Sequence, residues 1–408
     1  LSRGIVVEAY QQLVAEGYLL SRTGAGTWVA GGHSVAAAPE PRPAGAEPEP
    51  EFDLTPGRPD LAAFPRTAWV AALRRVLSDL PHVELGYGDP GGVARFREEI
   101  AGYLRRVRAA DATPDRVVAI NGSSQGLALG LQALYELGHR VLAVEDPSAV
   151  RPRRLLSASG MTLVGVPVDD AGLVVSELRR TDATVVFAGP AHQYPTGVVL
   201  APSRRAELIA WAHAVDGTIL EDDYDAEFRY DRDPVGCLQG MAPDRVLYLG
   251  TASKSLAPSL RLGWAVAPPH LVARMRQIRE NSDLGGSVLD HLAMAHLIAE
   301  GAYDRHLRTV RRRYRQRRDA LVGTLATEAP HWKVRGVAAG LHVLVDLPPS
   351  SDEEALVMAA EARGVRMQPL APLRFAPGPP GIVLGYAGLA PGRLAEAARR
   401  LAAAAREG

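Results

Sequence analysis

The spacing of apolar and polar positions divides the chain into three parts. In residues 1–30, apolar residues recur at helical spacing and are followed by glycine turns and β-forming residues, which predicts a helix and then a hairpin. Residues 31–52 are rich in Ala, Pro, Gly and Glu without any periodicity, which predicts a flexible linker. From residue 53 to residue 408 the pattern is that of a folded domain.

Within 53–408, short apolar runs alternate with helical patterns, which predicts an α/β fold with a large, mainly parallel sheet of seven strands. The predicted strands of this sheet are 117–120, 141–144, 163–166, 184–188, 218–220, 246–249 and 262–267. A long basic helix near 303–325 is followed by strands at 341–346 and 382–386 and helices at 352–363 and 393–405. We therefore expect a large domain at about 83–280 and a smaller α+β domain at about 300–408.

Composition narrows the class of protein. The 46 basic residues balance the 46 acidic ones, so no overall charge attracts the chain to nucleic acid or membranes. A single cysteine, Cys237, excludes an internal disulfide and a multi-cysteine zinc site, and we expect a cytoplasmic protein without a membrane span. Only two of the basic residues are lysines, Lys254 and Lys333, so a lysine in a chemical motif is unlikely to be there by chance.

The segment from Tyr248 to Gly263 combines one lysine with several groups that suit a phosphate. Lys254 follows a predicted strand in a loop of small residues, and a primary amine there can form a Schiff base with an aldehyde cofactor, which an arginine cannot. The hydroxyls of Thr251 and Ser253 and the guanidinium of Arg261 suit a phosphate monoester. The alternative is an ordinary surface lysine in a polar loop.

A predicted strand at 218–220 runs into Glu221-Asp-Asp-Tyr224-Asp-Ala-Glu, which places several carboxylates at the carboxyl edge of the sheet. A carboxylate facing a pyridine nitrogen keeps that nitrogen protonated and makes the ring an electron sink. A Mg²⁺ site is the rival interpretation, but it explains neither Lys254 nor Arg261, and we expect no metal. A third segment, Asn121-Gly-Ser-Ser-Gln125, links a strand to a helix and can seat an anion.

Together with Gly86-Tyr-Gly-Asp-Pro-Gly-Gly92 and Ala191-His-Gln-Tyr-Pro-Thr-Gly197, these segments resemble the MocR/GabR group of bacterial regulators. Members of that group fuse a GntR-type winged helix to an aminotransferase-like domain of fold type I that depends on pyridoxal 5'-phosphate (PLP). The resemblance covers nearly the whole chain. Its most specific motifs are residues 221–230 and 253–256.

The resemblance implies roles for individual residues. Lys254 would form the internal aldimine, Asp222 would pair with the pyridine nitrogen, and Tyr224 would bond the ring's phenolic oxygen. His192 either contacts the same oxygen or has a structural role beside Pro195. The residues expected to hold the phosphate are Ser123, Ser124, Gln125, Thr251, Ser253 and Arg261, with Tyr87 reaching the phosphate of the neighbouring subunit of a homodimer.

Some positions depart from the group's pattern. Arg374 is the candidate for a substrate carboxylate, because the strand at 382–386 lacks the arginine found there in many aminotransferases. Ala149 stands where relatives commonly carry an aromatic residue, which leaves one face of the cofactor ring less covered. Residues 1–30 look like the end of a GntR winged helix, so the resemblance implies DNA binding only where the winged helix is complete.

Two functions follow from this pattern. A regulator would sense an amine, an amino acid or PLP through the large domain and change how DNA is held. A stand-alone aminotransferase would use Lys254 first to hold PLP and then to move the substrate's α-proton in a ping-pong reaction. The two share a cofactor and do not exclude each other, so the sequence leaves enzymatic activity open. A third alternative is an interaction domain that has lost its cofactor.

Overall fold

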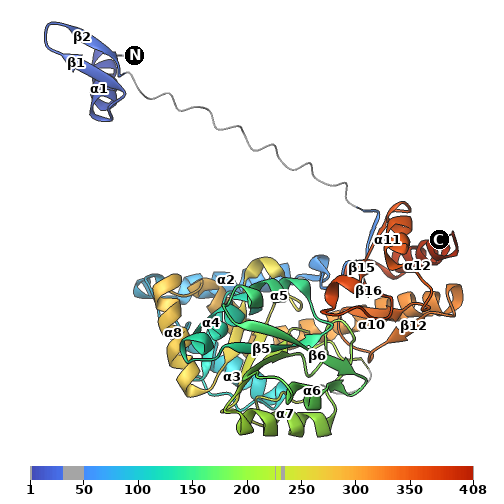
Figure 1. Cartoon of the computed structure of the whole chain (residues 1–408). Helices are drawn as coiled ribbons and strands as arrows, with labels where there is room; N and C mark the ends of the chain where they lie inside the picture. Colours follow the sequence, from blue (N-terminus) through green and yellow to red (C-terminus); the bar gives the residue numbers. More distant parts are fainter. Residues whose placement is uncertain (1, 31–49, 226, 231–234, 408) are drawn as a thin grey trace. The chain divides into compact units, whose positions relative to one another are not determined.

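The computed structural model describes residues 2–30, 50–225, 227–230 and 235–407 (Figure 1). Contacts divide the chain into two compact units, Leu1–Glu49 and Pro50–Gly408. The predicted linker lies outside the described residues except for residues 50–52. None of the described helices is both long enough and apolar enough to cross a lipid bilayer.

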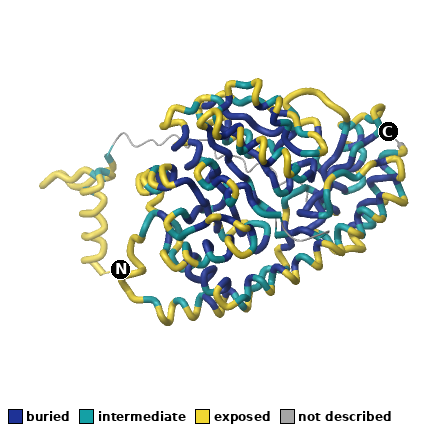
Figure 2. The backbone as a smooth tube through the Cα atoms, turned by 90° about the horizontal axis from the view of Figure 1, so that it is seen from below, coloured by how far each residue is buried: buried dark blue, intermediate teal, exposed yellow. Residues whose placement is uncertain are grey.

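The first unit contains one helix and one hairpin, as its pattern predicts. Helix α1 (Arg3–Ala15) is followed by strands β1 (Leu19–Arg22) and β2 (Gly26–Val29), which pair antiparallel. No residue of α1 is buried, and Figure 2 shows this helix exposed along its length.

The second unit contains an eight-stranded sheet of order β4-β11-β10-β9-β8-β5-β6-β7. Its strands are β4 (Val117–Ile120), β5 (Val141–Asp146), β6 (Thr162–Asp169), β7 (Gly172–Leu173), β8 (Val185–Ala188), β9 (Thr218–Asp223), β10 (Val246–Thr251) and β11 (Gly263–Val266). All neighbours pair in parallel except β11, which is antiparallel to β4 and β10, and β7, which is antiparallel to β6. Seven of these strands match the predicted ones. The eighth, β7, has only two residues and leaves no periodic pattern.

Both faces of this sheet are buried, because successive residues of each strand point to opposite sides. Ile120 and Leu249 belong to an apolar cluster with helices α4 (Ser123–Glu136), α5 (Val150–Ser157) and α8 (Pro269–Ser282). The other face is covered at one end by α6 (Val175–Leu178) and α7 (Pro202–Ala214). Its other end packs against α3 (Ala94–Arg108), α9 (Val288–Ala299) and α10 (Ala302–Glu328). Figure 2 shows the resulting buried interior of the domain.

A smaller antiparallel sheet follows α10 in the chain, as expected. Its order is β12 (Lys333–Arg335), β13 (His342–Asp346), β16 (Gly381–Gly385) and β15 (Gln368–Pro369), accompanied by α11 (Glu353–Glu361) and α12 (Pro391–Glu407). Strand β14 (Val365–Arg366) pairs in parallel with β3 (Phe52–Asp53). Helix α2 (Arg66–Asp79) packs against α9, so residues 50–80 contact both parts of the unit.

Candidate functional site

The predicted site residues gather at the carboxyl ends of strands β4, β9 and β10, where ligands bind in α/β sheets. Ser123 comes shortly after β4, Asp222 is the last residue but one of β9, and Lys254 comes three residues after β10. Three chain segments, the first of them about a hundred residues before the other two in sequence, are thus brought to one edge of the sheet.

Lys254 is half-buried, and its Nζ donates a hydrogen bond to the carbonyl oxygen of Gly57 at 2.5 Å. Burial lowers the pKa of its amine, Asp225 and Asp222 oppose that shift, and the positive charge of Arg151 adds to it. A lowered pKa leaves more of the amine unprotonated at neutral pH, and only the unprotonated amine attacks an aldehyde.

Asp222 lines a cavity of about 360 Å³, which falls within the size range of small-molecule sites, about 300–1,000 Å³. Burial raises the pKa of Asp222 to about 7; repulsion from Asp223 and Asp225 adds to the shift, and Lys254 opposes it. Its carboxyl group forms no hydrogen bond or ion pair with any described residue. A carboxylate held at a cavity wall without a cation suits a ligand that brings its own positive charge, such as a protonated pyridine.

Groups that suit a phosphate lie at the start of α4. Ser123 and Ser124 line the same cavity, and Gly122, the residue before the helix, offers no capping side chain to its first backbone N–H groups. Arg261 donates from Nη2 to the Asn121 carbonyl oxygen, and a Cβ built on Gly122 would lie 2.9 Å from that same nitrogen. Gly122 also has a φ of +86°, so both its conformation and the nearby guanidinium favour glycine here.

Three other predicted phosphate ligands, Thr251, Ser253 and Gln125, form different hydrogen bonds within the protein. Thr251 Oγ1 donates to Ser253 Oγ at 3.0 Å and lies 3.2 Å from the Leu262 carbonyl oxygen, so the two hydroxyls adjoin the lysine loop. The side chain of Gln125 is used within the protein, because its Oε1 accepts from Asn121 N at 2.6 Å and its Nε2 donates to Asp283.

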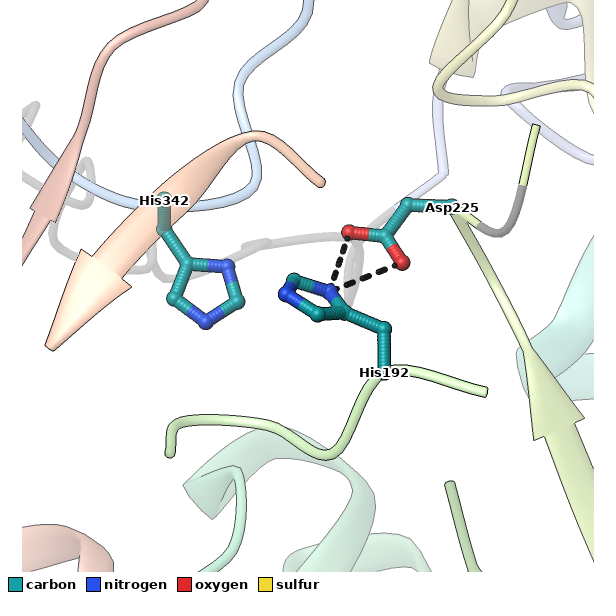
Figure 3. A group of neighbouring side chains, drawn as sticks. All are labelled: His192, Asp225 and His342. Atoms are coloured by element: carbon teal, nitrogen blue, oxygen red, sulfur yellow. Dashed lines mark hydrogen bonds and ion pairs between the residues drawn. The ribbon is translucent and has the colours of Figure 1, made fainter. Parts of the chain in front are cut away.

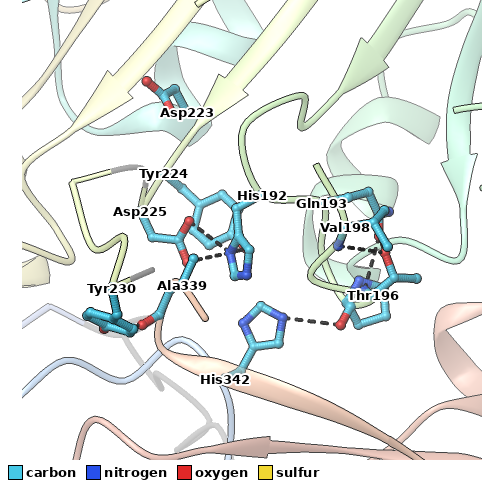
Figure 4. Close-up of polar contacts among 12 residues, drawn as sticks. His192, Gln193, Thr196, Val198, Asp223, Tyr224, Asp225, Tyr230, Ala339 and His342 are labelled. Atoms are coloured by element: carbon cyan, nitrogen blue, oxygen red, sulfur yellow. Dashed lines mark hydrogen bonds and ion pairs between the residues drawn. The ribbon is translucent and has the colours of Figure 1, made fainter. Parts of the chain in front are cut away.

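His192, Asp225 and His342, called here the His192 cluster, are buried together (Figure 3) and lie beside Tyr224 (Figure 4). His192 Nδ1 lies 3.0 and 3.1 Å from the two carboxylate oxygens of Asp225 and 3.3 Å from the Tyr224 hydroxyl. Only His192 and Tyr224 were predicted to belong to the site. Asp225 lies in the acidic run, whereas nothing in the sequence around His342 points to this position.

Arg151 is a further residue that sequence reasoning missed. It lies on α5, two residues after Ala149, and lines the same cavity as Asp222. Within the described part of the chain, its guanidinium forms no hydrogen bond or ion pair. It therefore brings an unpaired positive charge to the cavity that Asp222 also lines.

Two predicted residues lie apart from this group. Tyr87 is 93% exposed, as a residue that reaches another subunit would be, and its role remains a prediction. Arg374 donates from Nη2 to the Pro379 carbonyl oxygen at 2.8 Å, and the structure gives no contact between its side chain and Lys254 or Asp222. Its role as a carboxylate ligand also remains a prediction.

Comparison with known proteins decides the family. Residues 51–401 match the family described as aminotransferase class I and II. The chain is 32% identical to a probable rhizopine catabolism regulatory protein, MocR of Rhizobium meliloti, over 99% of this chain and 86% of that protein. It is 34% identical to the pyridoxine biosynthesis transcriptional regulator PdxR of Corynebacterium glutamicum, over 95% and 84% of the two chains. The chain belongs to the MocR-type regulators with an aminotransferase-like domain.

A solved structure supports the fold of this MocR-type protein. An archaeal alanine:glyoxylate aminotransferase superposes with a TM-score of 0.81, covering 87% of this chain and 91% of its own, at 23% identity. The fold is therefore that of a fold type I aminotransferase, and the cofactor of that fold is PLP. The residues fit this cofactor. Asp222, which has no partner among the described residues, and the uncapped start of α4 line one cavity; Lys254 is close enough to Asp222 for each charge to shift the other's pKa, and Arg261 lies beside Gly122.

The phosphate assignment leads to a first prediction for this MocR-type protein. Arg261→Gln is expected to weaken PLP binding about tenfold to a hundredfold, because a hydrogen bond to a charged group contributes about 1.5–3 kcal/mol. Glutamine keeps a side chain at the φ of +52° found here, so the backbone cost is unchanged. The dissociation constant can be measured by equilibrium dialysis. Arg274→Gln, which removes a surface ion pair with Glu136, is the control, and equal affinities for both variants would contradict the assignment.

Proposed function

We propose that this protein is a transcriptional regulator whose aminotransferase-like domain holds PLP on Lys254 and responds to a small amine, an amino acid or PLP itself. The observation that carries the proposal is similarity to named transcriptional regulators over nearly the whole chain. It is supported by Ser123, Ser124 and Asp222, which line one cavity. When bound, PLP supplies an aldehyde that captures amines and a ring that withdraws electrons.

The chain's own residues have defined tasks in this proposal. Lys254 offers an amine with a lowered pKa for attachment of the cofactor. Asp222 supplies the negative charge that a protonated ring nitrogen needs, and the phosphate is held by Arg261 and the first turn of α4. With PLP bound, an amine ligand would compete with Lys254 for the cofactor's aldehyde, so the Lys254 side chain is the part of the chain that would differ between the two states.

Residues 1–30 are proposed to be the recognition helix and wing of a GntR-type winged helix, because α1 and the β1–β2 hairpin occur in that order. The protein is also proposed to be a homodimer. Val83, Leu85 and Tyr87 are 83%, 58% and 93% exposed, and apolar side chains this exposed suit contact with a second copy. Tyr87 would then meet the phosphate in its partner's site.

Stand-alone transamination is the second candidate, because Lys254 and Asp222 are both in place for it. The two functions separate in one experiment, which measures fluorescence anisotropy of DNA from upstream of the protein's own coding region. An α-amino acid, an ω-amino acid and a monoamine are added in turn to the PLP-loaded protein, and keto acid release is followed in parallel.

A regulator is expected to change its DNA affinity about fivefold or more with one of these amines, the usual size of coupling between two sites. Its keto acid release should be far below ordinary enzyme rates of about 1–1,000 per second. Turnover within that range, with a DNA affinity that no amine alters, would contradict the regulator and support the enzyme.

A further inference from the structure

The His192 cluster joins three separate segments at one buried point. His192 lies in the loop after β8, Asp225 follows β9, and His342 opens strand β13 of the small sheet. Their exposed fractions are 3%, 1% and 3%. Polar groups buried this deeply are costly unless each hydrogen bond is made, so the position of every proton matters.

Asp225 fixes the proton of His192. An ionised carboxylate can only accept hydrogen bonds, and both of its oxygens lie within 3.1 Å of His192 Nδ1. Nδ1 must therefore carry a proton and donate it to Asp225. This is the arrangement by which a carboxylate selects one tautomer of a histidine.

That assignment decides what the Tyr224 hydroxyl can do. Its oxygen lies 3.3 Å from the same Nδ1, but a ring nitrogen that already carries a proton cannot accept a second one from Tyr224. The Tyr224 proton is left for another acceptor. Burial, followed by the charges of Asp225 and Asp222 and by Tyr194 and Tyr386, raises the pKa of this hydroxyl well above its usual value, so it stays a neutral donor.

His342 completes the arrangement without competing for that proton. Its Nε2 lies 3.2 Å from the Pro195 carbonyl oxygen, which can only accept, so Nε2 carries the proton of the ring. Burial, His192 and Lys254 lower the pKa of His342 well below its usual value, although its bond to Pro195 opposes the shift, so the ring is neutral. Its ring packs against His192 at 5.1 Å between centroids (Figure 3).

Gly340 closes the cluster from the side of the small sheet. A Cβ at this position would lie 2.2 Å from His192 Cε1 and 2.5 Å from Asp225 Oδ2, and its φ is +70°. The backbone of Gly340 is thus packed closely against the His192–Asp225 pair, and any larger residue here would collide with both side chains.

We propose that Asp225 and His192 are positioning residues that keep Tyr224 as a hydrogen-bond donor toward the ring oxygen of PLP. The inference rests on PLP occupying the cavity beside Asp222 and does not depend on DNA regulation. The three cluster residues also have metal-ligand chemistry, with their ligand atoms within 4.8 Å of one another. A metal on His192 Nδ1 would replace the bond to Asp225, so added Zn²⁺ provides an independent check.

The test is a pH titration of the visible absorption band of the PLP-loaded protein. A hydrogen bond donated to the ring oxygen stabilises its anionic form, so losing that donor lets the bound cofactor keep its proton to higher pH. In Asp225→Asn, the amide can donate to Nδ1, and the histidine then takes the other tautomer. The band's midpoint is expected to rise by about one pH unit, the equivalent of one hydrogen bond.

Three further variants make the interpretation specific. Tyr224→Phe should raise the midpoint by a similar amount, and the double variant with Asp225→Asn should add nothing, since both changes remove one donor. Tyr135→Phe is the matched control, because Tyr135 is 37% exposed near the end of α4, where its ring contacts Arg140 and not the cluster. The midpoint of this control variant should equal that of the native protein. Adding 1 mM Zn²⁺ to the native protein should leave its midpoint unchanged.

The tautomer itself can be read without any substitution. The ¹⁵N shifts of histidine in the native protein, assigned with His192→Gln, should show a proton on Nδ1 of His192. A proton on Nε2, an unchanged midpoint in Asp225→Asn, or additive shifts in the double variant would each overturn the proposal. Absence of a visible band in the native protein would overturn the proposed cofactor function as well, whereas a band that fails to shift would leave that function standing.

Discussion

Lys254→Ala is expected to abolish the visible absorption band of the PLP-loaded protein and the cofactor label that borohydride makes permanent. A covalent bond to the aldehyde requires a primary amine, and Lys254 is the lysine whose side chain reaches the Asp222 end of the sheet with a lowered pKa. The label should fall from one cofactor per chain to background, as measured by absorbance and by mass spectrometry of the intact protein.

The chain offers a matched control for this test. Lys333 is the other lysine of the sequence and lies exposed on β12, at the edge of the small sheet. Lys333→Ala should keep both the band and the label. If the label instead persists in Lys254→Ala and maps to Lys333, the assignment of the cofactor lysine is wrong.

Arg108→Leu is expected to lower the free energy of unfolding by about 3–5 kcal/mol, the usual cost of removing one partner of a buried ion pair. Arg108 and Asp223 are both almost fully buried, and Arg108 makes two hydrogen bonds to that carboxylate, at 2.8 and 3.1 Å. Leucine fills much of the space but, among the described residues, leaves the Asp223 carboxylate with only the Tyr248 hydroxyl as a side-chain partner.

Urea unfolding followed by circular dichroism measures this loss. Arg106→Leu, on the same helix, breaks an ion pair with Asp304 that is much more exposed, and it should cost about 1 kcal/mol or less. The difference between the variants tests whether the end of β9, which carries Asp222, is held by the buried pair. Equal losses in the two variants would contradict that conclusion.

The acidic run at the end of β9 shows how far the sequence could be interpreted. Strand alternation places Glu221 and Asp223 on one face and Asp222 on the other. In the structure, Glu221 accepts from the backbone of Leu238 and Gln239, and Asp223 pairs with Arg108, whereas Asp222 lines the cavity. The resemblance had named Asp222, and the period of two gives the physical reason why that carboxylate is the one left for a ligand.

Other parts of the site could not be predicted. The His192 cluster depends on the small sheet bringing His342 and Gly340 against the loop after β8, a contact between segments about 150 residues apart. Strands β7 and β12 are too short to leave a periodic pattern, so local sequence cannot reveal them. Arg151, Arg153 and Arg154 lie close together in sequence, and nothing in the sequence says that Arg151 and Arg154 are the ones that line the cavity.

The hydrogen bond from Lys254 to the Gly57 carbonyl oxygen depends on whether the lysine amine is free. Gly57 comes shortly after β3, so this hydrogen bond joins the lysine proposed to hold the cofactor to the stretch that follows the first strand of the second unit. A free amine has at least two protons to give this carbonyl, whereas an amine joined to an aldehyde keeps at most one. The hydrogen bond from Lys254 to the Gly57 carbonyl oxygen is therefore expected to be weaker when the amine is joined to the cofactor than when it is free. Gly57 lies near the start of the second unit, so the change falls close to where the chain leads toward residues 1–30.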